Sequence, residues 1–307
     1  MRIVSLVPAG TEIAFALGAG KEVVAVTHDC DFPAEARKLP RITRSAIVAG
    51  SDSRAIDTQV REAAARGEST FHLDAAAFTA ARPDILLGQT LCAVCAVTIA
   101  QVPATIDPAP AVVPLDGDSI EGIFTDIERA GVALGRRDAA GRLIADLRTR
   151  IAHIEWLVGG AGRPSVACLE WLAPLFNAGH WVPEQVGSAG GRDVLGEPGA
   201  RSREVTLADV AAVDPDVIVL MPCGFDAERA VRESQALVSD PLWPQLRAVR
   251  EGRAYAVDGN AYFSRPGPRV VDGIELLGSI LHPDRVETPK AGRAIPLAAT
   301  VLQRTGA

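Results

Sequence analysis

The sequence predicts an α/β protein of two Rossmann-like lobes, each built on a parallel sheet, joined by a long α-helix. Three observations support this fold class. Short apolar runs alternate with helical patterns from the first residue, residues 118–158 have helical periodicity almost throughout, and the second half of the chain repeats the plan of the first. At 307 residues the chain also exceeds the usual size of a single hydrophobic core.

The first lobe is expected to occupy residues 1–117. Residues 2–6 are typical of a strand, 11–17 of a helix that ends at two glycines, and 23–26 of the next strand. A strand, a helix and a strand in this order form a βαβ unit, whose strands pair in parallel. The segment 46–69 is interpreted as an insertion in this lobe.

The connecting helix is expected to occupy residues 118–158. Apolar residues recur at helical spacing, and Ser119 is a suitable N-cap. Gly135 could interrupt the segment, but we interpret it as one long helix. Residues 159–283 then form the second lobe, and 284–307 form a tail.

Two pairs of segments indicate that the lobes repeat one plan. Residues 2–6 and 165–169 each lead through a turn and a helix to a glycine-rich end. Further along, ARPDILL at 81–87 is echoed by VDPDVIV at 213–219. Two related lobes joined by one helix predict a cleft for a ligand.

Composition excludes several classes of partner and location. The formal net charge of −7 is spread along the chain without a basic stripe, which argues against nucleic acid. The sequence has no apolar run of membrane-spanning length and no recognisable leader, so we expect a cytoplasmic protein, or a periplasmic one if a leader has been removed. The five cysteines fit free thiols or ligands better than disulfides.

Several segments carry a resemblance to a known family. SLVPAGTEIAFALGAG at 5–20, VAVTHDCDFP at 24–33 and NAYFSRPGPR at 260–269 resemble segments of the cobalamin-binding proteins that serve ABC importers. The resemblance spans about residues 1 to 282. It implies the helix-linked fold of class III periplasmic binding proteins, with a corrinoid such as cobalamin bound between the lobes.

Within that family the chain is most similar to a leaderless branch. The segments that carry this similarity are HDCDFP at 28–33, QTLCAVCAV at 89–97 and FNAGHWVPE at 176–184.

The chain also departs from the exported carriers. Aromatic residues that line their corrinoid cleft are matched here by Asp29, by Ser45 and by the neighbourhood of Arg201. Glutamates that meet arginines of the membrane permease are matched by Ala76 and Ala208. We therefore do not expect productive docking on a vitamin B12 permease. Separately, we expect the chain to be a monomer.

The candidate ligand-binding residues fall in loops that follow predicted strands, where parallel α/β sheets bind ligands. The aromatic members offer flat faces for a large planar ligand. The arginine could bind a phosphate or an amide, or it could form a structural ion pair. The candidates are Pro8, Glu12, His28, Asp29, Cys30, Gln89, Cys92, Trp171, Phe176, His180, Trp181, Tyr262, Phe263 and Arg265.

A metal or redox site is a second possibility. Cys92 and Cys95 form a C-x-x-C pair that Cys30 could join, and His180 could contribute an imidazole. The three cysteines should then approach one another. The alternative is that Cys92 and Cys95 are small buried apolar residues at the start of a helix.

Three functions compete. The leading hypothesis is a protein that binds a corrinoid as a carrier, buffer or sensor. The second is an ABC importer's substrate-binding protein for a corrinoid, haem or a metal chelate. The third is a thiol- or metal-dependent enzyme, which has only the cysteines in its favour because the sequence contains none of the common catalytic motifs.

Overall fold

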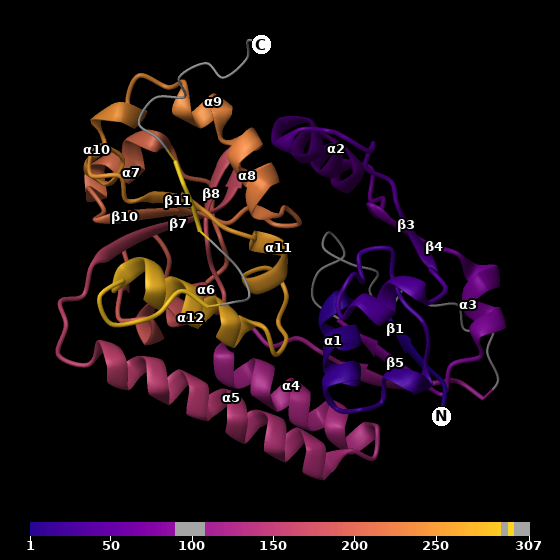
Figure 1. Ribbon diagram of the computed structural model, residues 1–307. Coiled ribbons are helices and arrows are strands. Elements are labelled where there is room, and N and C mark those ends of the chain that lie inside the picture. The colour runs from indigo at the N-terminus through magenta and orange to yellow at the C-terminus, as the bar shows by residue number, and fades with distance from the viewer. Residues whose placement is uncertain (90–107, 290–293, 298–307) are drawn as a thin grey trace, which may run out of the picture. The chain divides into compact units, whose positions relative to one another are not determined.

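The computed structural model describes residues 1–89, 108–289 and 294–297, and the chain divides into two compact units (Figure 1). Unit 1 comprises residues 1–51, 55–148 and 266–268, and unit 2 comprises the rest. Each unit is built on a mainly parallel sheet with helices, which confirms the predicted α/β class with two lobes.

Unit 1 contains a four-stranded parallel sheet in the order β2-β1-β5-β6. The strands are β1 (Ile3–Ser5), β2 (Val23–Ala25), β5 (Ile85–Gly88) and β6 (Ala111–Pro114). Every residue of β1 and β5 is buried, which explains why these strands are continuous apolar runs in the sequence. The associated helices are α1 (Pro8–Ala16), α3 (Ala75–Ala81) and the short 3₁₀ helices η1 (Gly20–Glu22) and η2 (Ala34–Lys38).

The segment interpreted as an insertion lies outside the parallel sheet. It carries α2 (Ser53–Ala65) and is flanked by β3 (Thr43–Ser45) and β4 (Phe71–Leu73). These two strands pair with each other in antiparallel fashion and form a separate two-stranded sheet.

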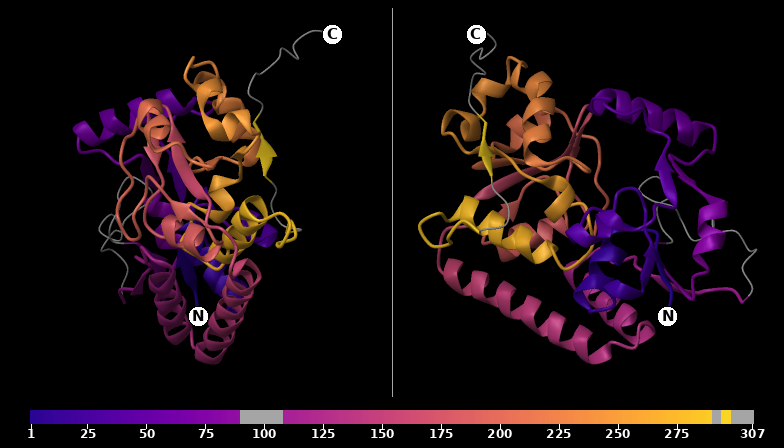
Figure 2. Two further views of the ribbon diagram at one scale, coloured as in Figure 1. Left: turned by 90° about the vertical axis from the view of Figure 1, so that its left-hand side faces the viewer. Right: turned by 45° about the vertical axis from the view of Figure 1, so that its right-hand side comes forward.

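The prediction of one long connecting helix is wrong, because the segment forms two helices, α4 (Ile120–Ala133) and α5 (Arg137–Val158). Figure 2 shows them meeting at a turn. Gly135 has a φ of 65°, and the N–H of Arg136 donates to Gly131 O at 2.7 Å, a bond typical of a glycine-terminated helix. Ser119 does cap α4, accepting from the N–H of Gly122.

The second helix belongs partly to each unit, since the division falls between residues 148 and 149. Within unit 1, Arg148 donates to Glu121 of α4 in an exposed pair. Within unit 2, Arg150 pairs with Asp272 and donates twice to Glu275, both on α12 (Val270–Leu281). The contacts of Arg150 are half-buried, so they anchor this end of α5.

We expect Arg150→Met to lower the free energy of unfolding by about 1–2 kcal/mol, because two carboxylates lose a charge-assisted hydrogen-bonding partner. Arg148→Met is the matched control. It removes an exposed ion pair and should cost less than about 1 kcal/mol. Urea denaturation of both variants checks the difference, and equal losses would contradict it.

Unit 2 contains a sheet in the order β12-β11-β10-β7-β8, with β9 also paired to β7. Strands β9, β7, β10 and β11 run parallel, whereas β8 and β12 are antiparallel to their neighbours. The strands are β7 (Ser165–Leu172), β8 (Leu175–Asn177), β9 (Arg192–Asp193), β10 (Val217–Leu220), β11 (Ala254–Ala256) and β12 (Ile295–Pro296).

Helices cover both faces of this sheet. Figure 1 shows α6 and α12 on one face and α7, α8 and α10 on the other. Trp243, in the 3₁₀ helix η4, is completely buried in the core on the second side. The elements not yet placed are α6 (Val182–Ser188), α7 (Leu207–Val213), α8 (Ala227–Glu233), α9 (Gln235–Val238), η4 (Trp243–Gln245), α10 (Arg247–Arg250) and α11 (Gly259–Tyr262).

The repeat seen in the sequence is a repeat of local structure. Arg82 ends α3 and Asp214 ends α7, each with positive φ (43° and 39°). Two residues later, Asp84 and Asp216 each accept a hydrogen bond of 2.7 Å from a backbone N–H at the start of a neighbouring strand, β1 in unit 1 and β7 in unit 2. The loop before β5 in unit 1 and the loop before β10 in unit 2 therefore have the same local structure, and each leads into a strand beside the first strand of its sheet.

The C-terminal segment contributes to the fold through β12, which pairs with β11 and is followed by the buried Leu297. Across the described parts of the chain, every helix is too short or too polar to cross a membrane.

Candidate functional site

The loops that follow β7 and β10 lie side by side in unit 2. These strands are parallel neighbours, with Leu169 opposite Leu220, so their carboxyl ends meet at one edge of the sheet. The N–H of Cys223, just beyond β10, donates to the backbone oxygen of Glu170 at 3.0 Å. This is the edge at which ligands bind in parallel α/β sheets.

A pair of tilted aromatic rings occupies this edge. The ring of Trp171 lies 5.3 Å from that of Phe225, and the guanidinium of Arg229 lies 3.7 Å from the centre of the Phe225 ring. Phe225 is only 3% exposed and lies between Trp171 and Arg229, contacting both, with its ring inclined at 46° to that of Trp171. Trp171, half-buried, is thus supported from behind by an aromatic ring that a cation holds in place.

Sequence reasoning missed Phe225 and Arg229. A signal was present for part of this set, because Arg229 and Glu233 are four residues apart on α8 and therefore share one side of it, while Phe225 precedes the N-cap Asp226. The guanidinium of Arg229 also lies 3.5 Å from the carboxylate of Glu233.

The loop after β8 holds His180 in an unusual conformation. His180 has a φ of 55°, a left-handed value that is uncommon for residues other than glycine. Its N–H donates to Ala200 O at 2.7 Å, and its oxygen accepts from the N–H of Gly199 at 2.9 Å. Strained backbone of this kind is maintained by its surroundings and is frequent at functional sites. The imidazole is half-exposed next to Trp181.

Glu170 is the half-buried acid of this edge. Burial raises the pKa of its carboxyl above the ordinary value of 4.5, against the opposing effects of Ser202, Gly179 and His180. The N–H of Gly179 lies 3.4 Å from the carboxylate. Glu170 therefore binds a proton more tightly in the folded protein than in the unfolded chain.

We expect Glu170→Gln to stabilise the protein relative to the native sequence at pH 8 but not at pH 4. Because the folded-state pKa is raised, ionising Glu170 costs stability, and this cost appears as the pH rises from about 4.5 to the raised value. The neutral amide avoids it. Thermal melting at both pH values checks the prediction, which fails if the difference in Tm is the same at each.

The loop after β2 in unit 1 is tightly held. Cys30 is fully buried, and its sulfur lies 3.1 Å from the hydroxyl oxygens of both Thr11 and Thr27. Arg41 donates to the backbone oxygens of Thr27 and Cys30, each at 2.6 Å. His28 is fixed in the same loop by Thr43, at 2.7 Å.

The remaining candidates divide by burial. Pro8, Gln89 and Phe176 are half-buried, and Asp29 is exposed. Several others are buried, each with at most 9% of its surface exposed. These are Glu12, Cys30, Trp181, Tyr262, Phe263 and Arg265. Ligand contact by any of the candidates stays a prediction, and the accessible Trp171, Phe176, His180, His28 and Asp29 are the better placed ones.

The metal prediction rests largely on residues outside the described ones, since Cys92 and Cys95 lie there. The described ranges contain no group of three or more His, Cys, Asp or Glu side chains placed to hold a metal ion. Burial raises the pKa of the Cys168 thiol well above its usual value, which makes it unreactive. The approach of Cys30 to Cys92 and Cys95 stays a prediction.

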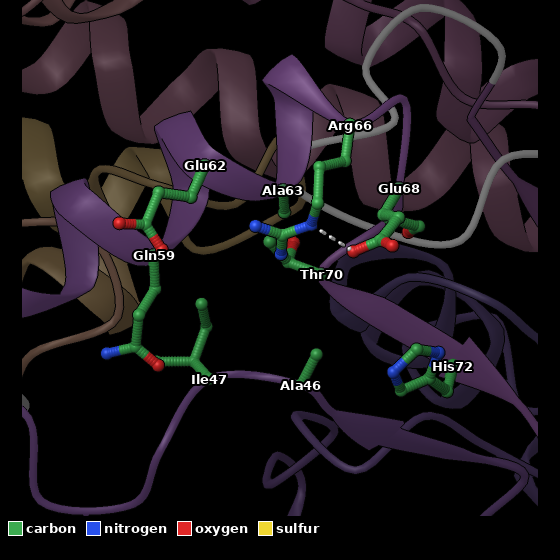
Figure 3. Close-up of a pocket in the computed structure, with 10 residues that line it drawn as sticks. Ala46, Ile47, Gln59, Glu62, Ala63, Arg66, Glu68, Thr70 and His72 are labelled. Carbon is green, nitrogen blue, oxygen red and sulfur yellow. Dashed lines mark hydrogen bonds and ion pairs between the residues drawn. The ribbon is translucent and has the colours of Figure 1, made fainter.

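Unit 1 also has a small polar hollow of about 150 Å³ under α2 (Figure 3). Arg66 and Glu68 pair across part of it, with Nε 2.9 Å from Oε2. Its charged side chains are exposed, and its lining comes from α2, β4 and the loops beside them, outside the parallel sheet. The lining residues are Ala46, Ile47, Gln59, Glu62, Ala63, Arg66, Glu68, Ser69, Thr70 and His72.

The positions compared with permease-contacting glutamates lie at corresponding places in the two units. Ala76 and Ala208 are exposed in the first turns of α3 and α7. The nearby carboxylates of Asp74 and Asp209 both cap these helices, the second in a capping box with Thr206. If either aspartate turned outward to take the place of a glutamate, its helix would lose the capping hydrogen bond that this aspartate makes.

Comparison with known proteins identifies relatives over nearly the whole chain. A family model described as periplasmic binding protein matches residues 3–261. The chain is 23% identical over 293 residues to the uncharacterized ABC transporter substrate-binding lipoprotein YvrC of Bacillus subtilis, covering 92% of this chain and 80% of that one. It is 23% identical over 288 residues to the vitamin B12-binding protein of Vibrio cholerae, covering 91% and 88%.

Solved structures share the fold. The periplasmic heme-binding protein RhuT from Roseiflexus matches with a TM-score of 0.68 at 24% identity, over 92% of this chain and 98% of that one. The periplasmic vitamin B12 binding protein BtuF of Vibrio cholerae matches with a TM-score of 0.64 at 19% identity, over 92% and 96%.

Proposed function

The chain belongs to the periplasmic binding protein family, and we propose that it binds a corrinoid reversibly, without transforming it, as a receptor or carrier. The observation that carries the proposal is the supported face of Trp171 at the carboxyl ends of β7 and β10. A flat, preorganised aromatic surface suits a large planar ligand. Similarity to a vitamin B12-binding protein over 91% of the chain supports the choice of ligand class.

The chemistry of the same edge supports binding rather than catalysis. Its half-buried acid, Glu170, accepts hydrogen bonds from Ser202 and Gly179, and these groups orient a loop. The nearby thiol of Cys168 has a raised pKa and is a poor nucleophile. The family consists of binding proteins, so the enzyme hypothesis has no support beyond the cysteines.

The second candidate ligand is haem or a related metal chelate. The heme-binding protein RhuT shares the fold over 92% of this chain, and a flat aromatic face suits a porphyrin as well as a corrin. With either ligand the expected partner is an ABC-type permease, the role for which the lipoprotein YvrC is named.

Titration decides between these ligands. We expect one cyanocobalamin or dicyanocobinamide per chain by calorimetry, with a shifted visible spectrum of the bound corrinoid. If haemin binds and neither corrinoid does, the second candidate replaces the first. If none of the three binds more tightly than about 100 μM, near −5.5 kcal/mol, the proposal fails.

Location is tested separately. The sequence predicted a cytoplasmic protein, whereas the names of the relatives favour an exported one. Fractionation of cells that express the complete gene from its own locus distinguishes the two. Complementation of a strain that lacks its own B12 receptor then tests the permease partner, with Ala76→Glu and Ala208→Glu as the variants expected to improve docking.

A further inference from the structure

His28 in unit 1 makes a set of contacts that bears on the tautomer of its neutral imidazole. Its Nδ1 lies 2.7 Å from the hydroxyl oxygen of Thr43, and its backbone N–H donates to the same oxygen at 3.0 Å. Its Nε2 lies 3.5 Å from Oδ2 of Asp29, at the long limit of a hydrogen bond. The ring packs against Phe71, with centres 5.4 Å apart.

The hydroxyl of Thr43 fixes the tautomer of His28. A hydroxyl carries a single proton, and this one already accepts from the backbone of His28. Thr43 is 7% exposed, and within the described parts of the chain its hydroxyl contacts no partner other than His28. A buried hydroxyl proton needs an acceptor, and Nδ1 is the acceptor at hand. The neutral imidazole therefore carries its proton on Nε2.

This tautomer decides what the imidazole can do at the end of β2. Nδ1 is occupied by Thr43, and Nε2 carries a hydrogen, so neither nitrogen offers a lone pair to a metal. The side chain of His28 is 23% exposed, and that of Asp29 is 49% exposed. A hydrogen-bond donor and a carboxylate acceptor thus stand next to each other at an accessible edge of the sheet.

We propose that His28 and Asp29 form a donor and acceptor pair that recognises a primary amide of the ligand. The amide oxygen accepts from Nε2–H, and the amide nitrogen donates to the carboxylate, which has several acceptor positions. Corrinoids carry primary amides around the macrocycle, whereas haem carries carboxylates that Asp29 repels. This inference rests on the proposed function and adds to it a reason for selecting a corrinoid.

The tautomer is measured without any ligand. In protein labelled with ¹⁵N-histidine, long-range ¹H–¹⁵N spectra at pH 7.5 should show His28 as the Nε2–H tautomer. Thr43→Ser keeps the hydroxyl and should keep the tautomer, whereas Thr43→Val should lose the preference. An Nδ1–H tautomer in the native sequence would overturn the inference.

Amide recognition is measured with cyanocobalamin and its separated monocarboxylic acids, in each of which one amide is replaced by a carboxylate. We expect at least one acid to bind about tenfold more weakly than cyanocobalamin, because it meets Asp29. In Asp29→Asn this difference should shrink to less than about threefold, since the variant does not repel a carboxylate and can donate to it. Asp146→Asn, an exposed change in α5, is the matched control and should keep the full difference.

The outcomes separate this inference from the proposed function. If cyanocobalamin binds but neither Asp29→Asn nor His28→Ala changes the preference for the amide, the pairing is wrong and corrinoid binding stands. If the native protein binds no corrinoid, both are wrong.

Discussion

Replacing Gly259 by alanine is expected to destabilise unit 2 by about 3 kcal/mol or more. A Cβ at this position would lie 2.4 Å from the backbone oxygens of both Met221 and Pro222. These atoms cannot easily retreat, because the N–H of Met221 donates to Leu169 O at 2.8 Å and extends the pairing of β10 with β7. Overpacking against a fixed backbone is among the most costly single substitutions.

Gly141→Ala is the matched control, because it makes the same chemical change inside α5. A Cβ there would meet nothing within 4 Å, so alanine should stabilise the helix by about 0.5–1 kcal/mol. Gly259 lies in unit 2 and Gly141 in unit 1. Urea denaturation is therefore followed by far-UV circular dichroism, which reports on the helices of both units, and by the fluorescence of the four tryptophans, which all lie in unit 2. Similar shifts of the midpoint in both variants would refute the steric argument.

The parallel sheets could be predicted because they depend on local patterns. Buried parallel strands such as Ile85–Gly88 and Val217–Leu220 are apolar on both faces, and the Pro-Asp pair before each one marks the loop that starts it. The carboxylate of that aspartate, Asp84 or Asp216, accepts a hydrogen bond from a backbone N–H at the start of a neighbouring strand. The repeat in the sequence therefore reflects a repeated physical requirement.

The break between α4 and α5 could not be predicted from local sequence patterns in the same way. Apolar spacing continues through the segment, and an isolated glycine inside a helix is tolerated. The break depends on packing between the two helices, since a Cβ at Gly131 would come 2.4 Å from the Cβ of Ala140. That contact brings together residues that a single helix would keep apart.

The candidate site could be located but not resolved into exposed and buried side chains. Loops at the ends of strands were predicted from the order of the elements. Whether Trp171 or Trp181 faces outward depends on packing instead. Trp181 precedes α6 and is buried, whereas Trp171 lies in β7, close to its end, and stays half-buried. Both tryptophans were predicted to contact the ligand because both follow a predicted strand in the sequence. Their exposure differs because their tertiary contacts differ.

Trp171→Ala is expected to weaken corrinoid binding by about 1–3 kcal/mol, which corresponds to roughly a 5- to 150-fold rise in Kd. The ring of Trp171 is held against Phe225, itself fixed by Arg229, so the native protein spends little conformational entropy in presenting it.

Trp171→Phe keeps a flat face and should retain most of the affinity. Trp156→Ala is the control, because that tryptophan is 75% exposed on α5 and should leave Kd unchanged. Calorimetric titration of the three variants with cyanocobalamin, after circular dichroism has established that each is folded, gives the comparison. Equal Kd values for Trp171→Ala and Trp156→Ala would remove the aromatic face from the binding site.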